Sequence, residues 1–201
     1  GRFAQEGVKG LNLISHDTSH YGVDLGLKQG LTALLRSLVT VKDVRWIRPF
    51  YLYPQQVTDE LLDLYAGEAR ITKYLDMPLQ HISDGMLKRM HRLGDRKHVT
   101  KLVERIRAKI PGVFFRTAFI VGFPGETDAM FEDTLELVDA CGLTYLHVFP
   151  FSARPGTPAA RMPQVPGARI KSRAARLRAK GGAVLDAYLR SLAGREVEVL
   201  I

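Results

Sequence analysis

Cysteine is nearly absent: Cys141 is the only one among 201 residues. No disulfide can form within the chain, so a disulfide-stapled secreted scaffold is excluded. So little cysteine is typical of a reducing compartment, and we expect a cytoplasmic protein.

Long apolar runs are also missing. None approaches the roughly 18 residues that would suggest a membrane span, and the first residues lack the pattern of a signal peptide. We therefore expect no membrane partner. The histidines show no metal spacing: His16 and His20 are four residues apart, without an accompanying carboxylate triad. We predict no metal site from them.

The composition that remains is that of a globular protein. It is 46% apolar and 25% charged, which is enough apolar material for a sizeable core. With 29 Lys and Arg against 21 Asp and Glu, the net charge is +8. This excess favours an acidic partner such as nucleic acid or a ribosome surface.

Short β-like runs alternate with stretches of helical period. The expected strands are residues 11–14, 44–53, 71–79, 113–121 and 145–151, and the last expected helix covers about 166–192. We expect Thr58 and Ser83 to cap two of the helices between them. Strict alternation predicts an α/β fold with a parallel sheet, and an open doubly wound sheet or a barrel would satisfy it.

Both ends of the chain suggest continuation. Residues 1–7 resemble the end of a helix closed by Gly7, and residues 195–201 alternate like a strand without a partner. We expect further sequence before Gly1.

In either architecture, ligands gather at the carboxyl ends of the strands. Polar, glycine-rich or aromatic segments follow the expected strands there, and we expect these segments to build one site. They are SHDTSHYG (15–22), Tyr51 to Pro54, QHIS (80–83), GFPGET (122–127) and FSARPGTPA (151–159).

The segment GFPGET supplies three candidate ligand residues. Gly122 and Gly125 allow a tight turn that exposes amides, and Glu126 can accept a hydrogen bond from a ligand ammonium group. An ordinary strand-to-helix turn has the same composition.

Three further candidates lie on or after expected strands. Gln80 and His81 can bind a ribose or a base edge, although a histidine at a strand end is often structural. Arg116 interrupts an apolar strand, so it either faces a polar cavity or forms a structural ion pair.

A basic helix is expected at residues 169–180. Ile170, Ala174 and Leu177 form an apolar stripe, and basic residues surround it. A solvated face explains these charges. Contact with RNA or ribosome phosphates through Arg173, Arg176 and Arg178 is the alternative.

Taken together, several segments in order resemble the methylthiotransferases among the radical S-adenosylmethionine enzymes, over nearly the whole chain. They are LISHDTSHYG, WIRPFYLYP, KYLDMPLQHIS, LKRMHR, FRTAFIVGFPGET and FSARPGTPA. The first two thirds most resembles the branch that modifies an aspartate of a small-subunit ribosomal protein. Residues 141–166 look more like the branch that modifies a transfer RNA adenosine.

The resemblance implies a partial parallel (βα) barrel at residues 1–194, incomplete at its N-terminus. It further implies that residues 195–201 begin a C-terminal RNA-binding β domain. S-adenosylmethionine would lie across the strand ends, with Gly122, Gly125 and Glu126 in its loop and Gln80, His81 and Arg116 facing it.

Family members also hold four-iron four-sulfur clusters on cysteines spaced C-x-x-x-C-x-x-C. This chain lacks that motif, and one cysteine cannot supply three ligands. The family likeness therefore predicts placement of cofactor and substrate by this chain, with the cluster ligands elsewhere in an intact enzyme served by a reductant protein.

The predicted function is methylthiolation of an aspartate of a ribosomal protein, and the isolated chain is expected to be inactive. Three alternatives remain open: modification of a transfer RNA adenosine, a non-catalytic RNA-binding or ribosome-binding module, and an unrelated α/β barrel enzyme for nucleotides.

Overall fold

The computed structural model describes residues 1–199. Its chain divides into two compact units. Unit 1 contains residues 1–77, 102–114 and 194–199, and unit 2 contains residues 78–101 and 115–193.

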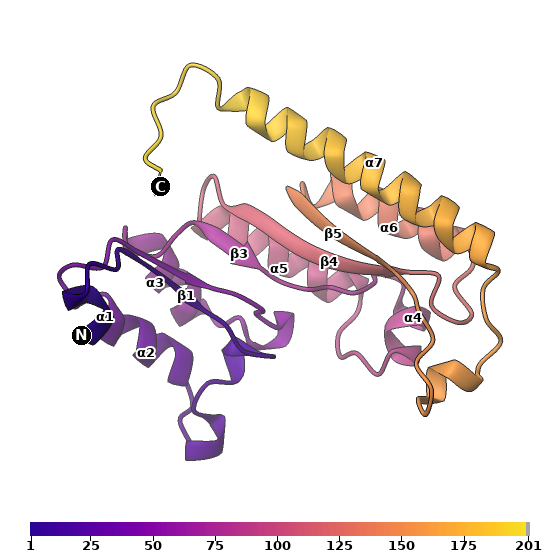
Figure 1. The fold of residues 1–201 in the computed structure, drawn as a ribbon, viewed down its shortest axis with the longest axis horizontal. Helices are drawn as coiled ribbons and strands as arrows, with labels where there is room; N and C mark the ends of the chain where they lie inside the picture. The colour runs from indigo at the N-terminus through magenta and orange to yellow at the C-terminus, as the bar shows by residue number, and fades with distance from the viewer. Residues whose placement is uncertain (200–201) are drawn as a thin grey trace. The chain divides into compact units, whose positions relative to one another are not determined.

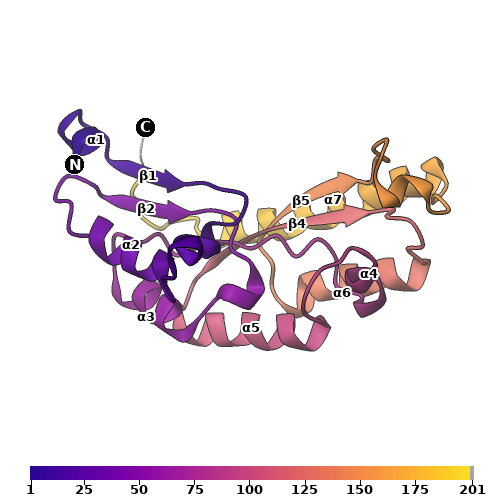
Figure 2. The same ribbon diagram turned by 90° about the horizontal axis from the view of Figure 1, so that it is seen from below.

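Unit 1 is built on parallel strands. The strands β1 (Gly10–Leu13) and β2 (Trp46–Pro49) pair in parallel, with Leu11 opposite Ile47. An isolated parallel bridge joins Ile47 to Ile71, and the short strand β3 (Tyr74–Asp76) follows in the chain. Figure 2 shows α2 (Gly30–Leu38) and α3 (Asp59–Gly67) on one side of β1 and β2.

The buried faces of these elements form the core of unit 1. Leu35 of α2, Ile47 of β2 and Leu62 of α3 are each fully buried. The short helix α1 (Arg2–Gln5) ends as expected before Gly7, which has a φ of +92°. Thr58 caps α3 by accepting from the amide of Leu61 at 3.2 Å, so this predicted cap is confirmed.

Unit 2 contains the parallel pair β4 (Phe114–Val121) and β5 (Tyr145–Pro150), apart from Phe114, which belongs to unit 1. Figure 1 shows α7 (Gly167–Ser191) running beside β5 and α6 (Asp128–Ala140). Alternate residues of β4 are buried, Phe115 and Phe119 among them, whereas Arg116, Ala118 and Ile120 are half-buried. The sheet of unit 2 is therefore covered by helices on one face.

Two further helices complete the described chain. The helix α4 (Asp84–Arg89) follows the QHIS segment, and α5 (Arg96–Lys109) contributes residues to both units. Ser83 occupies the N-cap position of α4, but its side chain makes no capping hydrogen bond. The predicted side-chain cap is wrong there, because backbone amides reach the Ser83 carbonyl instead, from Met86 and Leu87 at 2.9 Å each.

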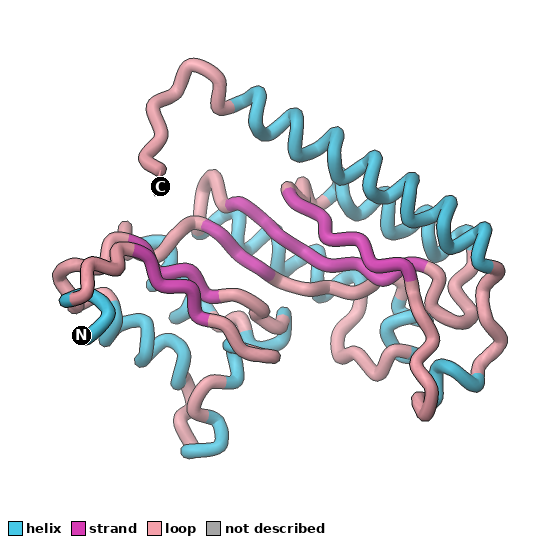
Figure 3. Tube along the Cα trace, in the orientation of Figure 1, coloured by secondary structure: helices cyan, strands magenta, loops and turns pink. Residues whose placement is uncertain are grey.

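The α/β class with parallel strands is confirmed, and all five expected strands occur. Two of them, β2 and β3, are much shorter than predicted, and β4 and β5 are each one residue shorter. Strand β2 ends at Pro49, which has no N–H, and Tyr51 adopts a φ of +55°. Strand β3 stops before Pro78, and Gln80 adopts a φ of +67°. Figure 3 shows both strands as short magenta segments within longer loops.

The structure describes only part of the predicted C-terminal strand at residues 195–201. Residues 195–199 have no regular secondary structure, and residues 200–201 lie outside the described residues. The start of a second domain at residue 195 therefore stays a prediction.

One buried group of unit 1 predicts a stability change. Tyr65 is fully buried, burial raises the pKa of its hydroxyl, and that hydroxyl has no hydrogen-bond partner among the described residues. Removing an unsatisfied buried hydroxyl relieves a desolvation cost, so Tyr65→Phe should raise the free energy of unfolding by about 1 kcal/mol. Urea denaturation measures this. The control Tyr21→Phe alters a half-exposed side chain and should change nothing, and a less stable Tyr65→Phe variant would contradict the prediction.

Candidate functional site

The glycine-rich loop after β4 is a tight turn closed by its own glutamate. Gly122 and Gly125 have φ values of +78° and +84°, a region that favours glycine. The amide of Gly122 donates to Oε2 of Glu126 at 2.6 Å. Thr127 then caps α6 by accepting from the amide of Met130 at 3.2 Å. The loop thus leads directly into the helix.

Glu126 is fully engaged inside unit 2. Its side chain is 0% exposed. Besides the amide of Gly122, it accepts from Nε2 of His81 at 3.1 Å and from Nη1 of Arg173 at 2.6 Å. Both oxygens already accept hydrogen bonds and the side chain is enclosed, so Glu126 does not face a ligand in this structure, which corrects its predicted role. This carboxylate holds the loop.

His81 is equally enclosed. It is 1% exposed, and its Nδ1 accepts from the amides of Ile82 and Ser83 at 2.9 and 3.0 Å. Because Nδ1 is an acceptor, the ring proton is on Nε2, which donates to Glu126. The predicted contact of His81 with a ligand is therefore corrected, and the structural alternative holds.

Arg173 joins the same buried cluster. It is 2% exposed, and Nη1 donates to both the carbonyl and Oε2 of Glu126, at 3.1 and 2.6 Å. Nη2 donates to Oδ1 of Asp128 at 2.6 Å, and this hydrogen bond is the main cause of the lowered pKa of Asp128. The predicted nucleic-acid contact of Arg173 is corrected, because its guanidinium is buried and paired.

The other two arginines of α7 with a predicted nucleic-acid contact, Arg176 and Arg178, lie nearer the surface. Arg176 makes two hydrogen bonds to Glu132, at 2.7 and 3.0 Å, and lies over the ring of Phe131. Arg178 donates to the carbonyl of Val148 at 3.1 Å. Their contact with a nucleic acid stays a prediction.

Arg116 lies on the face of β4 opposite its buried residues. Its Nη2 is 3.1 Å from Nδ1 of His147, and the His147 ring stacks on Phe149 at 4.5 Å. Arg116 is the third residue of β4, so it lies well before the strand's carboxyl end.

Gln80 is joined to the carboxyl half of β4. Its amide donates to the Ala118 carbonyl and its carbonyl accepts from the amide of Ile120, both at 2.8 Å. With its neighbours it lines a cavity of about 380 Å³, which we call the rim cavity. The lining includes Gln80, Arg89, Met90, Ile120, Phe123 and Met162. The predicted meeting of Gln80 with the loop is thus observed, because Phe123 belongs to that loop.

Sequence reasoning assigned no role to several residues of the rim cavity. Arg89 belongs to the LKRMHR segment after QHIS, and Thr157 to the segment after β5. Both segments were recognisable as family motifs, but no residue type in them pointed to a cavity. A Cβ at Gly125 would meet only Nη1 at the movable end of the exposed Arg89 side chain, so the positive φ is what favours glycine there.

Unit 1 shows a similar meeting of strand ends. The amide of Thr18 donates to the Tyr51 carbonyl at 3.1 Å, and the amide of Tyr53 donates to Oγ of Ser19 at 3.1 Å. These bonds tie the segment after β1 to the segment after β2.

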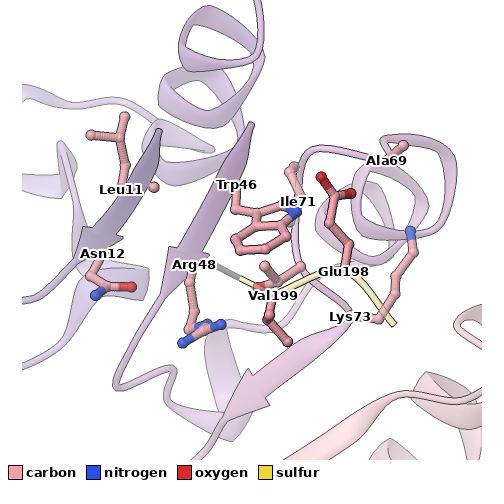
Figure 4. Close-up of a pocket in the computed structure, with 11 residues that line it drawn as sticks. Leu11, Asn12, Trp46, Arg48, Ala69, Ile71, Lys73, Glu198 and Val199 are labelled. Carbon is pink, nitrogen blue, oxygen red and sulfur yellow. The ribbon is translucent and has the colours of Figure 1, made fainter. Parts of the chain in front are cut away.

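A larger cavity of about 690 Å³ lies elsewhere in unit 1. Figure 4 shows Trp46 and Arg48 of β2 with Glu198 and Val199 around it. It reaches Gly10 and Trp46, the first residues of β1 and β2, and no predicted site residue lines it. Since ligands of parallel sheets gather at the carboxyl ends of the strands, the rim cavity is the better candidate site.

The described residues offer no ligand set for a metal. Within residues 1–199, no three His, Cys, Asp or Glu side chains are grouped to hold a metal ion, and Cys141 is buried at the end of α6. No helix in this part of the chain is long and apolar enough to cross a membrane.

Comparison with known sequences gives consistent matches. A family model described as the radical SAM superfamily matches residues 15–138. The ribosomal protein uS12 methylthiotransferase RimO of Anaeromyxobacter sp. (strain K) is 46% identical over 98% of this chain and 42% of its own length. The protein of the same name from Solibacter usitatus is 45% identical over 100% and 44%. The chain spans less than half the length of these curated relatives.

Solved structures agree on the fold. Coproporphyrinogen III oxidase (HemN) from Escherichia coli, described as a radical SAM enzyme, matches 79% of this chain and 37% of its own, with a TM-score of 0.63 and 19% identity. The radical S-adenosylmethionine methyltransferase TsrM from Kitasatospora setae matches 79% and 31%, with a TM-score of 0.60 and 17% identity. At such identities the likeness shows the fold alone.

The buried cluster predicts unequal costs for two arginine substitutions on α7. Arg173→Met leaves Glu126 buried without its cation and should lower the free energy of unfolding by about 3 kcal/mol. The matched control Arg176→Met breaks a half-exposed pair and should cost less than about 1 kcal/mol. Urea denaturation compares the two variants, and equal losses would refute the assignment.

The same variant should change the titration of Asp128. Its lowered pKa in the folded state means that the carboxylate stabilises the fold above its ordinary pKa, and that this contribution is lost as the pH falls through the folded value. Arg173→Met should raise the pKa of Asp128 toward the ordinary value and reduce that acid-side loss. Carboxyl shifts followed by NMR across acidic pH measure it, and an unmoved pKa would count against the Arg173 contact.

Proposed function

The chain belongs to the radical SAM superfamily, and on that premise we propose that it is the cofactor-placing and substrate-placing part of a methylthiotransferase acting on an aspartate of ribosomal protein uS12. The observation that carries this proposal is the 46% identity to a uS12 methylthiotransferase over 98% of the chain. This match to the Anaeromyxobacter relative also covers the last third of the chain, the part that resembles the transfer RNA branch. The identity therefore favours the ribosomal protein as the substrate.

S-adenosylmethionine is the proposed cofactor, and the rim cavity suits part of it. About 380 Å³ falls within the usual range for small-molecule pockets, roughly 300 to 1,000 Å³. Phe123 and Ile120 offer apolar surface to an adenine ring. The side-chain amide of Gln80 can both donate a hydrogen bond to a base or a ribose and accept one from it. Gly122, Gly125, Glu126 and His81 contribute by holding the loop, and Arg116 faces the open side of the sheet.

The four-iron four-sulfur cluster of this family does not fit the residues described. It needs three thiolates, and the chain has one buried cysteine. The proposal therefore assigns no step of cluster chemistry to this chain. Its residues bind, orient and shield the groups that react, while a cofactor carries the difficult chemistry.

The partners follow from the same proposal. The substrate protein belongs to the ribosome, which places the enzyme in the cytoplasm, and a reductant protein serves the intact enzyme. Modification of a transfer RNA adenosine is the alternative outcome.

A chimeric enzyme tests the function. The aligned segment of the Anaeromyxobacter relative is replaced by this chain, and the reconstituted chimera is assayed on uS12 by mass spectrometry. We expect one added methylthio group on an aspartate. Phe123→Ala should reduce the rate at least about tenfold by removing the apolar contact, while the control Phe3→Ala, an exposed residue of α1, should not. Modification of transfer RNA in place of uS12 would contradict the substrate assignment.

A further inference from the structure

The larger cavity, of about 690 Å³, lies beside β1 and β2 of unit 1. Alternate residues of a strand share a face, so Trp46 and Arg48 of β2 point to the same side of the sheet. Asn12 of β1 lies opposite Arg48 in the register. Figure 4 shows the side chains of all three at this cavity. Its volume is within the usual range for a small-molecule site.

Trp46 gives this cavity an aromatic surface. Its side chain is half-buried and lines the cavity. Gly10 of β1 lies opposite Trp46, and a glycine has no side chain that could cover the indole from that strand. A planar ring can therefore stack on Trp46, as nucleic-acid bases stack on aromatic side chains.

Arg48 is a cation without a hydrogen bond or an ion pair among residues 1–199. Its guanidinium carbon lies 4.9 Å from the centre of the Tyr74 ring. Its Nε is buried and donates to none of these residues, so within the described chain the Tyr74 ring alone holds the guanidinium. A buried donor without an acceptor is costly, and a guanidinium held only by stacking can turn its donors toward an anion.

The other charged groups that line this cavity are already engaged. Lys73 donates to the Ala66 carbonyl at 3.0 Å, in the last turn of α3. Glu198 forms an ion pair with Arg45, outside the lining. Arg48 therefore keeps a positive charge that no carboxylate of the described lining neutralises, and this charge favours an anionic ligand.

We propose that this cavity of unit 1 is a nucleotide site, in which a base stacks on Trp46 and a phosphate accepts hydrogen bonds from Arg48. Arginine binds phosphate through two parallel hydrogen bonds. The two residues are two positions apart on β2, about 7 Å, which is comparable with the span from a base to its 5′ phosphate. The Asn12 amide can donate to and accept from a base edge or a ribose.

A nucleotide suits the cavity better than an acidic peptide does. Both would satisfy Arg48, but a base also offers Trp46 a large planar face, and the net charge of +8 attracts a phosphate. The inference does not rest on the proposed function, because the rim cavity is lined by residues of unit 2 and this cavity by residues of unit 1.

The fluorescence of the 201-residue chain gives a direct readout, because Trp46 is its only tryptophan. Adenosine 5′-monophosphate (AMP), adenosine and inorganic phosphate are titrated separately. We expect AMP to quench Trp46 saturably and inorganic phosphate to compete with AMP. Adenosine should bind at least about tenfold more weakly than AMP, because it lacks the charge-assisted hydrogen bonds to Arg48.

Matched variants assign the two contacts. Arg48→Gln should weaken AMP at least about tenfold and leave adenosine unchanged, and Arg48→Lys should lose less. The control Arg36→Gln removes an exposed charge from α2 and should bind AMP as the parent chain does. Trp46→Leu, measured by calorimetry, should weaken AMP and adenosine alike by about tenfold. Circular dichroism and urea unfolding establish that each variant is folded.

A short single-stranded oligoadenylate distinguishes two sources of the nucleotide. If the site takes a nucleotide unit of RNA, the oligonucleotide binds at least about ten times more tightly than AMP, and this binding also depends on Arg48. If the site takes a free nucleotide, the oligonucleotide binds no more tightly than AMP.

Four results would overturn the proposal. One is the absence of a saturable change in Trp46 fluorescence with both AMP and the oligonucleotide, and another is AMP binding that Arg48→Gln leaves intact. Tighter binding of the dipeptide phenylalanyl-aspartate than of AMP would show that the cavity prefers an acidic peptide. Displacement of AMP by S-adenosylmethionine would show that the two ligands share one site.

Discussion

The arrangement of the candidate site depends on one buried carboxylate. Glu126 accepts hydrogen bonds from His81, from Arg173 and from the amide of Gly122, so it joins the QHIS segment, α7 and the end of β4. A buried carboxylate is costly unless its charge is paired and its oxygens are satisfied, and both conditions hold here. Removing any one partner would leave the others in an unfavourable environment, which explains why so many polar groups converge in a dry interior.

This cluster separates the residues that hold the site from those that face a ligand. His81, Glu126 and Arg173 are enclosed, and their hydrogen bonds end on one another, on the backbone or, for Nη2 of Arg173, on Asp128. Gln80, Arg89 and Phe123 line the cavity instead. The polar residues that the sequence analysis selected as ligand contacts thus hold the loop, whereas two arginines without a predicted role, Arg89 and Arg92, line the cavity.

The sequence predictions were accurate for features that depend on neighbouring residues in the chain, and less accurate for features that depend on the rest of the fold. Alternation along 113–121 and helical spacing along 166–192 predicted β4 and α7 to within a residue or so, because burial on one face is a local pattern. Strands β2 and β3 came out shorter, since Tyr51 and Gln80 adopt positive φ values that ordinary propensity does not anticipate. The Ser83 cap failed because backbone hydrogen bonds replaced it.

The amino-acid sequence by itself determined the α/β class, the glycine-rich turn after β4 and the family. The first two depend on patterns among neighbouring residues, and the family is evident from the order of the motifs. Only the tertiary structure decided which polar side chains point inward. Arg173 and Arg176 are three residues apart on one helix, yet one is buried against Glu126 and the other is half-exposed. That difference arises from the rotation of α7 against its neighbours, and it depends on side chains some 45 residues away along the chain, such as Glu126, 47 residues from Arg173.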